Sequence, residues 1–306
     1  MNKADNNNYH IPVLFTETVE ALNIKPDGVY VDCTFGGGGH SKGILDKLNA
    51  TGKLFAFDQD TDAQQNVLQD GRVVFVPHNF RHLQRFLRLH KIDKVDGVLA
   101  DLGVSSHQFD EGSRGFSTRF NGPLDMRMNI HQPVTAKQVV ETYTAQQLQW
   151  IFQEYGQVTN SKTLAAHIVA SRIGKQIESI EQFKTLISPL VKGNPNKYLA
   201  QVFQALRIEV NDEVGALKEM LQQLPNVLKE GGRAAIITFH SLEDRLVKNY
   251  YKNGAFEIEE DLNPFSTEVK EKIFKLISKK PIEASAEETK RNTRSRSAKL
   301  RIVEKM

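Results

Sequence analysis

The segment from Val29 to Leu48, VYVDCTFGGGGHSKGILDKL, contains the pattern that decides the fold. A run of β-branched and aromatic residues ends at Asp32, four glycines occupy positions 36–39, and apolar residues then recur at helical spacing. This order predicts a strand, a glycine loop and a helix. Because glycine has no Cβ, such a loop can turn sharply and let a ligand approach the N–H groups of a helix N-terminus. The segment therefore predicts the first unit of a nucleotide-binding α/β sheet.

The glycine loop is compatible with two cofactor classes. The dinucleotide fingerprint G-x-G-x-x-G needs glycine or alanine at its sixth position, which is Ser41 when Gly36 is the first. This mismatch weakens an NAD-dependent oxidoreductase without excluding it. An acid at the strand end followed by Thr34, Gly36 and Gly38 is similar to the first motif of S-adenosylmethionine (AdoMet) methyltransferases, in which glycine is more usual than Thr34. A tight turn that binds nothing is the third interpretation.

Composition bounds the class of protein. The chain has 306 residues, 40% of them hydrophobic and 25% charged, as in a globular protein of one or two domains. Cys33 is the only cysteine, which rules out an intrachain disulfide and favours a reducing compartment. The chain has no membrane-length apolar run, no signal peptide at its polar start and no spaced His/Cys cluster. We expect a cytoplasmic protein with no metal and no membrane association.

Strand patterns recur at 53–58, 73–76, 95–100 and 233–239, which predicts a parallel, doubly wound sheet. Ligands bind such sheets beyond the carboxyl ends of the strands, where three side chains fall. Asp58 can accept hydrogen bonds from two ribose hydroxyls, although a cap for a helix from Thr61 is the alternative. Phe80 can stack on an adenine or belong to the core. Asp101 ends the fourth strand.

The middle of the chain follows a different pattern. A polar, glycine-containing loop covers 109–133, and strand signals are almost absent from 135–205, where five helix-like segments follow one another. We expect an inserted all-helical lobe. The predicted domains are a discontinuous cofactor-binding domain, 1–110 and 207–306, and an inserted domain of loop and helices, 111–206.

The last part of the chain holds a helix, an irregular segment and a basic run. Ser241 and Asp244 fit a capping box, which leaves His240 at the functional edge of the sheet. The sequence from 253 to 288 is irregular and charged, and we expect a poorly ordered loop. Six bases and no acid occur from Lys290 to Arg301, as in a phosphate-binding segment or a solvated chain end. The candidate phosphate contacts are Arg291, Arg294, Arg296, Lys299 and Arg301.

Taken together, the motifs resemble one family, the bacterial ribosomal RNA small subunit methyltransferases H (RsmH, also called MraW). The resemblance covers nearly the whole chain, with its motifs in order. The matching segments are His10–Leu14, Asp32–His40, Asp101–Ser106, Arg114–Ser117, Leu124–Met128, Phe203–Arg207, Phe239–Arg245 and Arg294–Arg301.

The resemblance implies AdoMet-dependent methylation of the exocyclic N4 of a cytidine in the decoding region of 16S ribosomal RNA, within the small ribosomal subunit. It also implies a class I methyltransferase fold, a Rossmann-like doubly wound sheet with an inserted helical domain. The implied cofactor contacts are Gly38, Gly39, His40, Asp58, Phe80, Asp101 and Gln108. His107 and Phe109 stand where the family commonly has proline and leucine, and 156–160 is less charged than its family counterpart.

The expected chemistry gives Asp101, Ser105 and Gln108 the catalytic roles. An amine conjugated to a pyrimidine ring is a poor nucleophile, and acceptors aimed at its N–H groups favour a lone pair that can attack the methyl group. We expect Asp101 to anchor the cofactor or accept from this amine, and Ser105 and Gln108 to position a base that is flipped out or single-stranded. An AdoMet-dependent enzyme acting on DNA or protein, a non-catalytic RNA-binding protein and an NAD-dependent oxidoreductase remain as alternatives.

Overall fold

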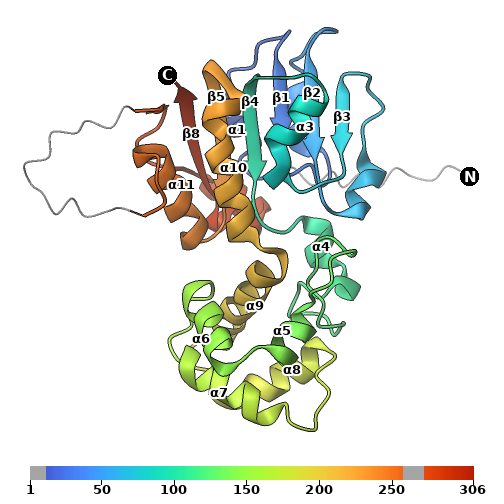
Figure 1. The fold of residues 1–306 in the computed structure, drawn as a ribbon, viewed down its shortest axis with the longest axis vertical. Helices are drawn as coiled ribbons and strands as arrows, with labels where there is room; N and C mark the ends of the chain where they lie inside the picture. The colour runs from blue at the N-terminus through green and yellow to red at the C-terminus, as the bar shows by residue number, and fades with distance from the viewer. Residues whose placement is uncertain (1–11, 258–271) are drawn as a thin grey trace, which may run out of the picture. The chain divides into compact units, whose positions relative to one another are not determined.

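The structure, a computed structural model, describes residues 12–257 and 272–306 and divides into two compact units (Figure 1). Unit 1 comprises Met1–Leu102 and Leu217–Met306, and unit 2 comprises Gly103–Ala216. The sequence suggested boundaries at 110/111 and 206/207 instead. The difference has a packing cause, because Val210 belongs to the apolar interior of unit 2 and the partly buried Val104 packs against that interior. Residues 10 and 11 of the first family motif lie outside the described residues.

Unit 1 is built on one eight-stranded sheet whose path has the order β3-β2-β1-β4-β5-β8-β6. The first five strands of that path are parallel, whereas β8 is antiparallel to β5, β6 and β7. The strands are β1 (Val29–Asp32), β2 (Lys53–Phe57), β3 (Val73–Val76), β4 (Val95–Asp101), β5 (Leu228–Thr238), β6 (Phe274–Leu276), β7 (Ile282–Glu283) and β8 (Lys299–Lys305). The predicted doubly wound sheet is confirmed. Its strand order reverses between β1 and β4, the place where such sheets bind ligands.

Helices pack on this sheet because its central strands are apolar on both faces. Every residue of β4 from Val95 to Ala100 is buried. The helical elements are α1 (Phe15–Ala21), α2 (Gly39–Leu45), η1 (Thr61–Asn66), η2 (Phe80–His82), α3 (Leu83–Leu89), α11 (Ser241–Asn253), α12 (Ala286–Arg291) and η5 (Thr293–Ser297). Helix α10 (Glu213–Val227) begins in unit 2 and ends in unit 1.

The expectation of a poorly ordered loop over 253–288 is wrong for its second half. Residues 272–288 include β6, β7 and the start of α12, whereas 258–271 lie outside the described residues. Strands of three and two residues are too short to produce an alternating pattern in the sequence. They form because β8 offers them an edge for pairing. None of the described helices is long and apolar enough to span a membrane.

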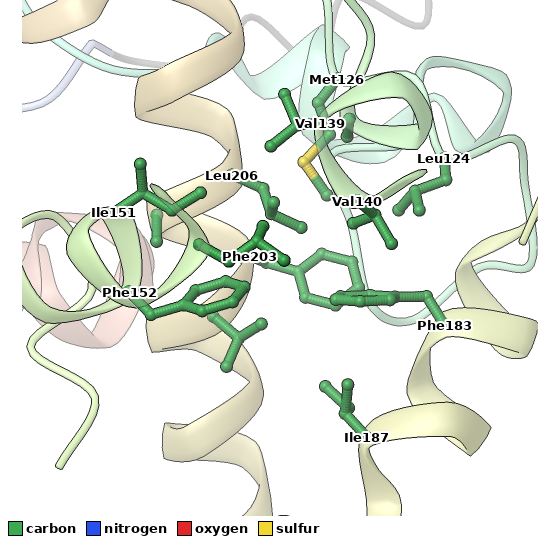
Figure 2. Close-up of a cluster of buried hydrophobic side chains, with 14 of the residues drawn as sticks. Leu124, Met126, Val139, Val140, Ile151, Phe152, Phe183, Ile187, Phe203 and Leu206 are labelled. Atoms are coloured by element: carbon green, nitrogen blue, oxygen red, sulfur yellow. The ribbon is translucent and has the colours of Figure 1, made fainter. Parts of the chain in front are cut away.

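Unit 2 is helical, as predicted. It contains α4 (Ser106–Asp110), η3 (Gly112–Arg114), α5 (Ala136–Thr142), α6 (Ala145–Glu154), α7 (Ser161–Ser171), α8 (Ile180–Ile187), η4 (Ser188–Leu190) and α9 (Pro195–Asn211). Its interior is a cluster of apolar side chains that includes Phe152, Phe183 and Phe203 (Figure 2). Capping boxes begin α5, α6 and α8, so local sequence defines these helix starts.

Candidate active site

The buried Asp32 side chain holds the glycine loop in place by accepting two hydrogen bonds. Its Oδ1 accepts a hydrogen bond from the Thr34 N–H at 3.0 Å, and its Oδ2 accepts one from the Ser41 hydroxyl at 2.7 Å. Burial raises the pKa of Asp32, and these hydrogen bonds oppose that rise. Ser41, at the sixth position of the dinucleotide pattern, is fully buried and serves the loop itself. The position that needs glycine or alanine in an NAD site is therefore filled by a structural hydroxyl.

Thr34 joins the glycine loop to the end of β4. Its Oγ1 accepts a hydrogen bond from the backbone N–H of Asp101 at 2.7 Å and lies 3.5 Å from Asp32 Oδ1. A glycine at this position could make neither contact. The departure from the usual methyltransferase motif thus fixes the backbone of Asp101.

Gly37 is the glycine of the loop that faces open space. A Cβ added there would meet nothing within 4 Å, whereas one at Gly38 would lie 2.9 Å from the Phe35 ring. Gly38 also has φ +75°, a left-handed conformation that glycine adopts without strain. A Cβ on Gly39 would collide with Pro12. The sequence named Gly38 and Gly39 as cofactor contacts, but Gly37 offers the more open approach to the backbone.

Asp58 lies beside the loop as a partly buried acceptor. Its Oδ2 accepts from the Gly36 N–H and its Oδ1 from the Asp60 N–H, both at 2.8 Å. Burial raises the pKa of Asp58 to about 6, so the carboxylate is ionised at neutral pH. The helix-cap alternative for Asp58 is wrong, because Asp60 caps η1 by accepting from the Asp62 N–H at 3.0 Å. The carboxylate fits the expected ribose acceptor.

Phe80 begins η2 and is partly exposed. The Asn79 side chain fixes this turn by accepting from the Arg81 N–H at 2.9 Å. The Phe80 ring stacks on no other aromatic ring in the part of the chain that the structure describes. The ring is thus neither a stacked partner within the core nor a fully buried side chain, which keeps the expected adenine contact as a prediction.

His40 is buried and neutral. Its Nε2 lies 3.1 Å from the Val13 carbonyl oxygen, so the proton resides on Nε2 and is donated to that oxygen. Burial lowers the pKa of His40 to about 4. Its Nδ1 is 3.7 Å from Asp101 Oδ2, and its ring stacks on Phe15. His40 is therefore an uncharged neighbour of the Asp101 carboxylate, and its unprotonated Nδ1 donates no hydrogen bond to it.

Asp101 carries the unsatisfied acceptor of this edge. Its side chain is 24% exposed, yet its Oδ1 is buried and has no hydrogen-bond partner among the described residues. Burial raises the pKa of Asp101 well above its ordinary value, and the charges of Asp32 and Glu243 raise it further. A buried acceptor without a donor is costly and is typical of a ligand site. A donor on a ligand would satisfy it.

Glu243 is a buried acid that the sequence did not reveal. Its Oε2 accepts from the Phe239 N–H at 3.0 Å, and its Oε1 lies 3.2 Å from His240 Nε2. His240, not Ser241, is the N-cap of α11, because Ser241 is already the first helical residue. The sequence does contain a signal for this cap: Glu243 lies three residues after His240, which is the capping spacing shifted by one residue from Ser241 and Asp244.

The three predicted catalytic residues belong to different units. Asp101 is in unit 1, and Ser105 and Gln108 are in unit 2. Ser105 and Gln108 form the capping box of α4: the Gln108 N–H donates to Ser105 Oγ at 3.2 Å, and the Ser105 N–H donates to Gln108 Oε1 at 2.9 Å. Their first role is thus to start a helix.

The basic run near the C-terminus is partly neutralised within unit 1. The Arg301 guanidinium pairs with both carboxylate oxygens of Asp244, at 2.6 and 3.1 Å, and Lys299 Nζ is 3.7 Å from the same carboxylate. Arg291 and Arg296 are exposed, and Arg294 is partly buried in η5. In the described ranges, no group of three or more His, Cys, Asp or Glu residues could hold a metal ion.

Comparison with known proteins gives one consistent result. The family model of the MraW methylase family matches residues 7–306. A protein of Bacteroides fragilis (strain YCH46) is 52% identical over 304 residues, which are 99% of each chain. A protein of Phocaeicola vulgatus is 53% identical over 298 residues, and one of Christiangramia forsetii is 51% identical over 299 residues. The matches cover 97% of this chain and 97% and 98% of theirs, and all three are named ribosomal RNA small subunit methyltransferase H.

Proposed function

Because the chain belongs to the MraW methylase family, we propose that it transfers a methyl group from AdoMet to the N4 amine of a cytidine in the decoding region of 16S ribosomal RNA. The observation that carries the proposal is the match over almost the entire length to relatives named for small-subunit ribosomal RNA methylation. The small ribosomal subunit is the proposed partner, and the cytoplasm is the proposed location.

The carboxyl edge of the unit 1 sheet fits AdoMet. The Asp58 carboxylate suits the ribose hydroxyls, the Phe80 ring suits the adenine, and the open backbone at Gly37 suits close approach of the rest of the molecule. The unpaired Oδ1 of Asp101 offers one more acceptor. When bound, AdoMet supplies an electrophilic methyl group on a sulfonium centre.

Asp101 would activate the amine. A carboxylate that accepts an N–H bond from the target amine draws its lone pair out of conjugation and holds the nitrogen in line for attack. The attacking nitrogen becomes cationic and strongly acidic, and the high pKa of Asp101 suits it to receive the released proton. Neutral His40 beside it adds no positive charge that would lower this pKa.

Ser105 and Gln108 enter the proposal as positioning residues. Their side chains lock the start of α4, a few residues after Asp101 along the chain. The Ser105 hydroxyl accepts in the capping box and keeps its own proton to donate. We propose that this donor and the fixed turn help to hold the cytosine.

Methyl transfer from labelled AdoMet to small ribosomal subunits that lack the modification tests the proposal. Label should appear as N4-methylcytidine after nucleoside digestion, and intact fully modified subunits should accept none. Label in a different nucleoside would replace the substrate assignment. AdoMet binding by calorimetry without any labelled RNA would direct the search to DNA or protein substrates.

A further inference from the structure

A pocket at one end of the unit 1 sheet gathers positive charge that the proposed active site does not use. It has a volume of about 310 Å³ and lies where α11, β8 and the residues around β6 meet. Helix α11 and strand β8 lie side by side there (Figure 1). Its polar lining consists of Lys248, Tyr251, Lys252, Ser278, Lys279 and Arg301. We call it the α11–β8 pocket.

Three lysines of the pocket have no acidic partner. Lys248 and Lys252 are four residues apart on α11, so they share one face and repel each other. Neither they nor Lys279 form an ion pair with any residue of 12–257 or 272–306. The nearby acid, Asp244, is already paired with Arg301 at 2.6 Å and has Lys299 at 3.7 Å. The pocket therefore keeps a positive charge that nothing in the described chain neutralises.

Two hydroxyls of the lining residues are also unsatisfied. Ser278 Oγ and Tyr251 Oη are buried and have no hydrogen-bond partner among the described residues. Tyr251 as a whole is only 3% exposed. Burial raises the pKa of Tyr251 well above its ordinary value, so the phenol keeps its proton and is a donor. The uncompensated cations that line the pocket match a negatively charged ligand such as a phosphate, and the unsatisfied hydroxyls belong to two of the lining residues.

The strand register relates this pocket to the active site. Asp101 on β4 is aligned with Ile237 on β5, which is aligned with Leu300 on β8, the residue before Arg301. Two strand spacings separate Asp101 from Leu300, or about 10 Å. The register thus places Leu300, the neighbour of the pocket residue Arg301, level with Asp101 across two strands, and the rest of the pocket extends from there along α11 and β8.

We propose that the α11–β8 pocket binds a backbone phosphate of the RNA strand that carries the target cytidine. The inference rests on the proposed function, and it names the contact that holds the substrate strand. It also changes the expectation that the basic segment Lys290–Arg301 by itself binds phosphate. Arg301 acts within this pocket, and the cations added to it come from α11 and from Lys279, outside the run.

A charge-matched pair of variants tests the proposal. The test variant is Lys248→Gln/Lys252→Gln/Lys279→Gln, and the control is Lys47→Gln/Lys53→Gln/Lys91→Gln. The control lysines are likewise exposed, and Lys53 lies on β2, which β1, β4 and β5 separate from β8. Both variants lose three charges, so a general effect of net charge is the same in each. Calorimetry with AdoMet should give the wild-type affinity for both.

The readouts are the KM for small subunits and the filter-binding affinity for the same subunits, each across a salt series. The test variant should raise KM about tenfold and lower the slope of log affinity against log salt by about one, while kcat is retained. The control should match the wild type. Equal behaviour of the two variants would overturn the proposal. If wild-type enzyme methylates no subunit, the proposed function fails, and the filter-binding comparison still decides about the pocket.

A second experiment distinguishes binding of an RNA phosphate in the pocket from binding of free phosphate. Inorganic phosphate at millimolar concentration should shift the backbone amide resonances of Ser278 and Lys279 in the wild type and not in Lys248→Gln/Lys252→Gln/Lys279→Gln. Ser278→Ala should weaken this binding and raise the melting temperature, because it removes a buried hydroxyl that lacks a partner. Phosphate binding together with an unchanged subunit KM would identify a site for free phosphate and overturn the RNA assignment.

Discussion

The two units bury different kinds of polar residue. The acids and the histidine that are fully buried in the described chain, Asp32, His40, Asp60, Asp96 and Glu243, all belong to unit 1. The buried polar residues of unit 2 are amides and hydroxyls: Gln108, Ser117, Asn160, Ser161 and Asn211. Burying a charge costs far more than burying a hydrogen-bonded amide. Unit 1 therefore carries a cost that unit 2 avoids.

The location of these buried groups indicates why unit 1 tolerates the free-energy cost of burying them. Asp96 is paired with Lys25 and Lys229, which explains it structurally. The others lie at or beside the carboxyl edge of the sheet, together with the partly exposed Asp101, whose Oδ1 lacks a partner. Unit 2 instead has an apolar interior and helices that begin with capping boxes. Unit 1 thus gathers most of its buried acids at one edge of its sheet, whereas the interior of unit 2 is stabilised by apolar packing.

The largest expected effect is on the packing of unit 2. Phe183 is fully buried, and its ring lies 5.9 Å from that of Phe203. Phe183→Ala should lower the free energy of unfolding by about 3–5 kcal/mol, because a large cavity replaces the ring. Trp150, which is 51% exposed, is the control, and Trp150→Ala should cost less than about 1 kcal/mol. Similar losses in denaturant titrations of the two variants would contradict a stability based on packing.

Two acids of unit 1, the partly exposed Asp101 and the buried Asp96, should respond in opposite ways. Asp101→Asn should lower kcat/KM about 100-fold, because the amide is a poor acceptor for the amine, while the fold keeps its stability. Asp96→Asn should keep kcat/KM and lose about 1–3 kcal/mol, because Lys229 at 2.6 Å loses its partner. Kinetics and denaturation of both variants measure this contrast. Full activity of Asp101→Asn would remove Asp101 from the active site.

A smaller effect is expected from the pH dependence of Asp58. Its pKa of about 6 means that the carboxylate loses its charge just below neutral pH. The AdoMet dissociation constant should therefore rise about tenfold from pH 7 to pH 5. Asp58→Asn should bind more weakly and show a flatter pH profile. Calorimetry across this range measures both, and a wild-type constant independent of pH would exclude Asp58 as a ribose acceptor.

The raised pKa of Asp58 also predicts how the free energy of unfolding depends on pH. The folded pKa of about 6 lies above the ordinary value of 3.8, so the folded state holds the proton more tightly than the unfolded state. The contribution of Asp58 to the free energy of unfolding should fall as pH rises from about 4 to 6. Asp58→Asn should then be more stable than the wild type at pH 7 and lose this advantage below pH 4. A difference independent of pH would contradict the assigned shift.

The smallest expected effect is at a helix start of unit 2. Thr144 Oγ1 accepts from the Gln147 N–H at 3.2 Å, and Gln147 Oε1 accepts from the Thr144 N–H at 2.9 Å. Thr144→Ala should cost about 1 kcal/mol of stability, whereas Thr144→Ser should cost little, since serine keeps the acceptor. Denaturant titration separates the two. AdoMet affinity should stay unchanged in both, and a fall in it would contradict the purely structural role.

Local sequence patterns were sufficient to predict the elements that are stabilised by residues close together in the sequence. The helices of unit 2 follow their apolar spacing and their capping residues, and the strands β1 to β5 follow their runs of β-branched and other apolar residues. Local patterns were insufficient for elements that form only by pairing with segments far away in the sequence. The strands β6 and β7 exist because β8 pairs with them.

The sequence by itself determined the sheet, the inserted helices, the family and the acids at the strand ends, because these depend on residue type and spacing along the chain. Only the tertiary structure decided what each side chain does. It committed Asp32 and Ser41 to the loop, left Asp101 Oδ1 without a donor from residues 12–257 and 272–306, and paired Arg301 with Asp244. Burial and pairing between segments far apart in the sequence set the free energy of a charge, and no local pattern records them.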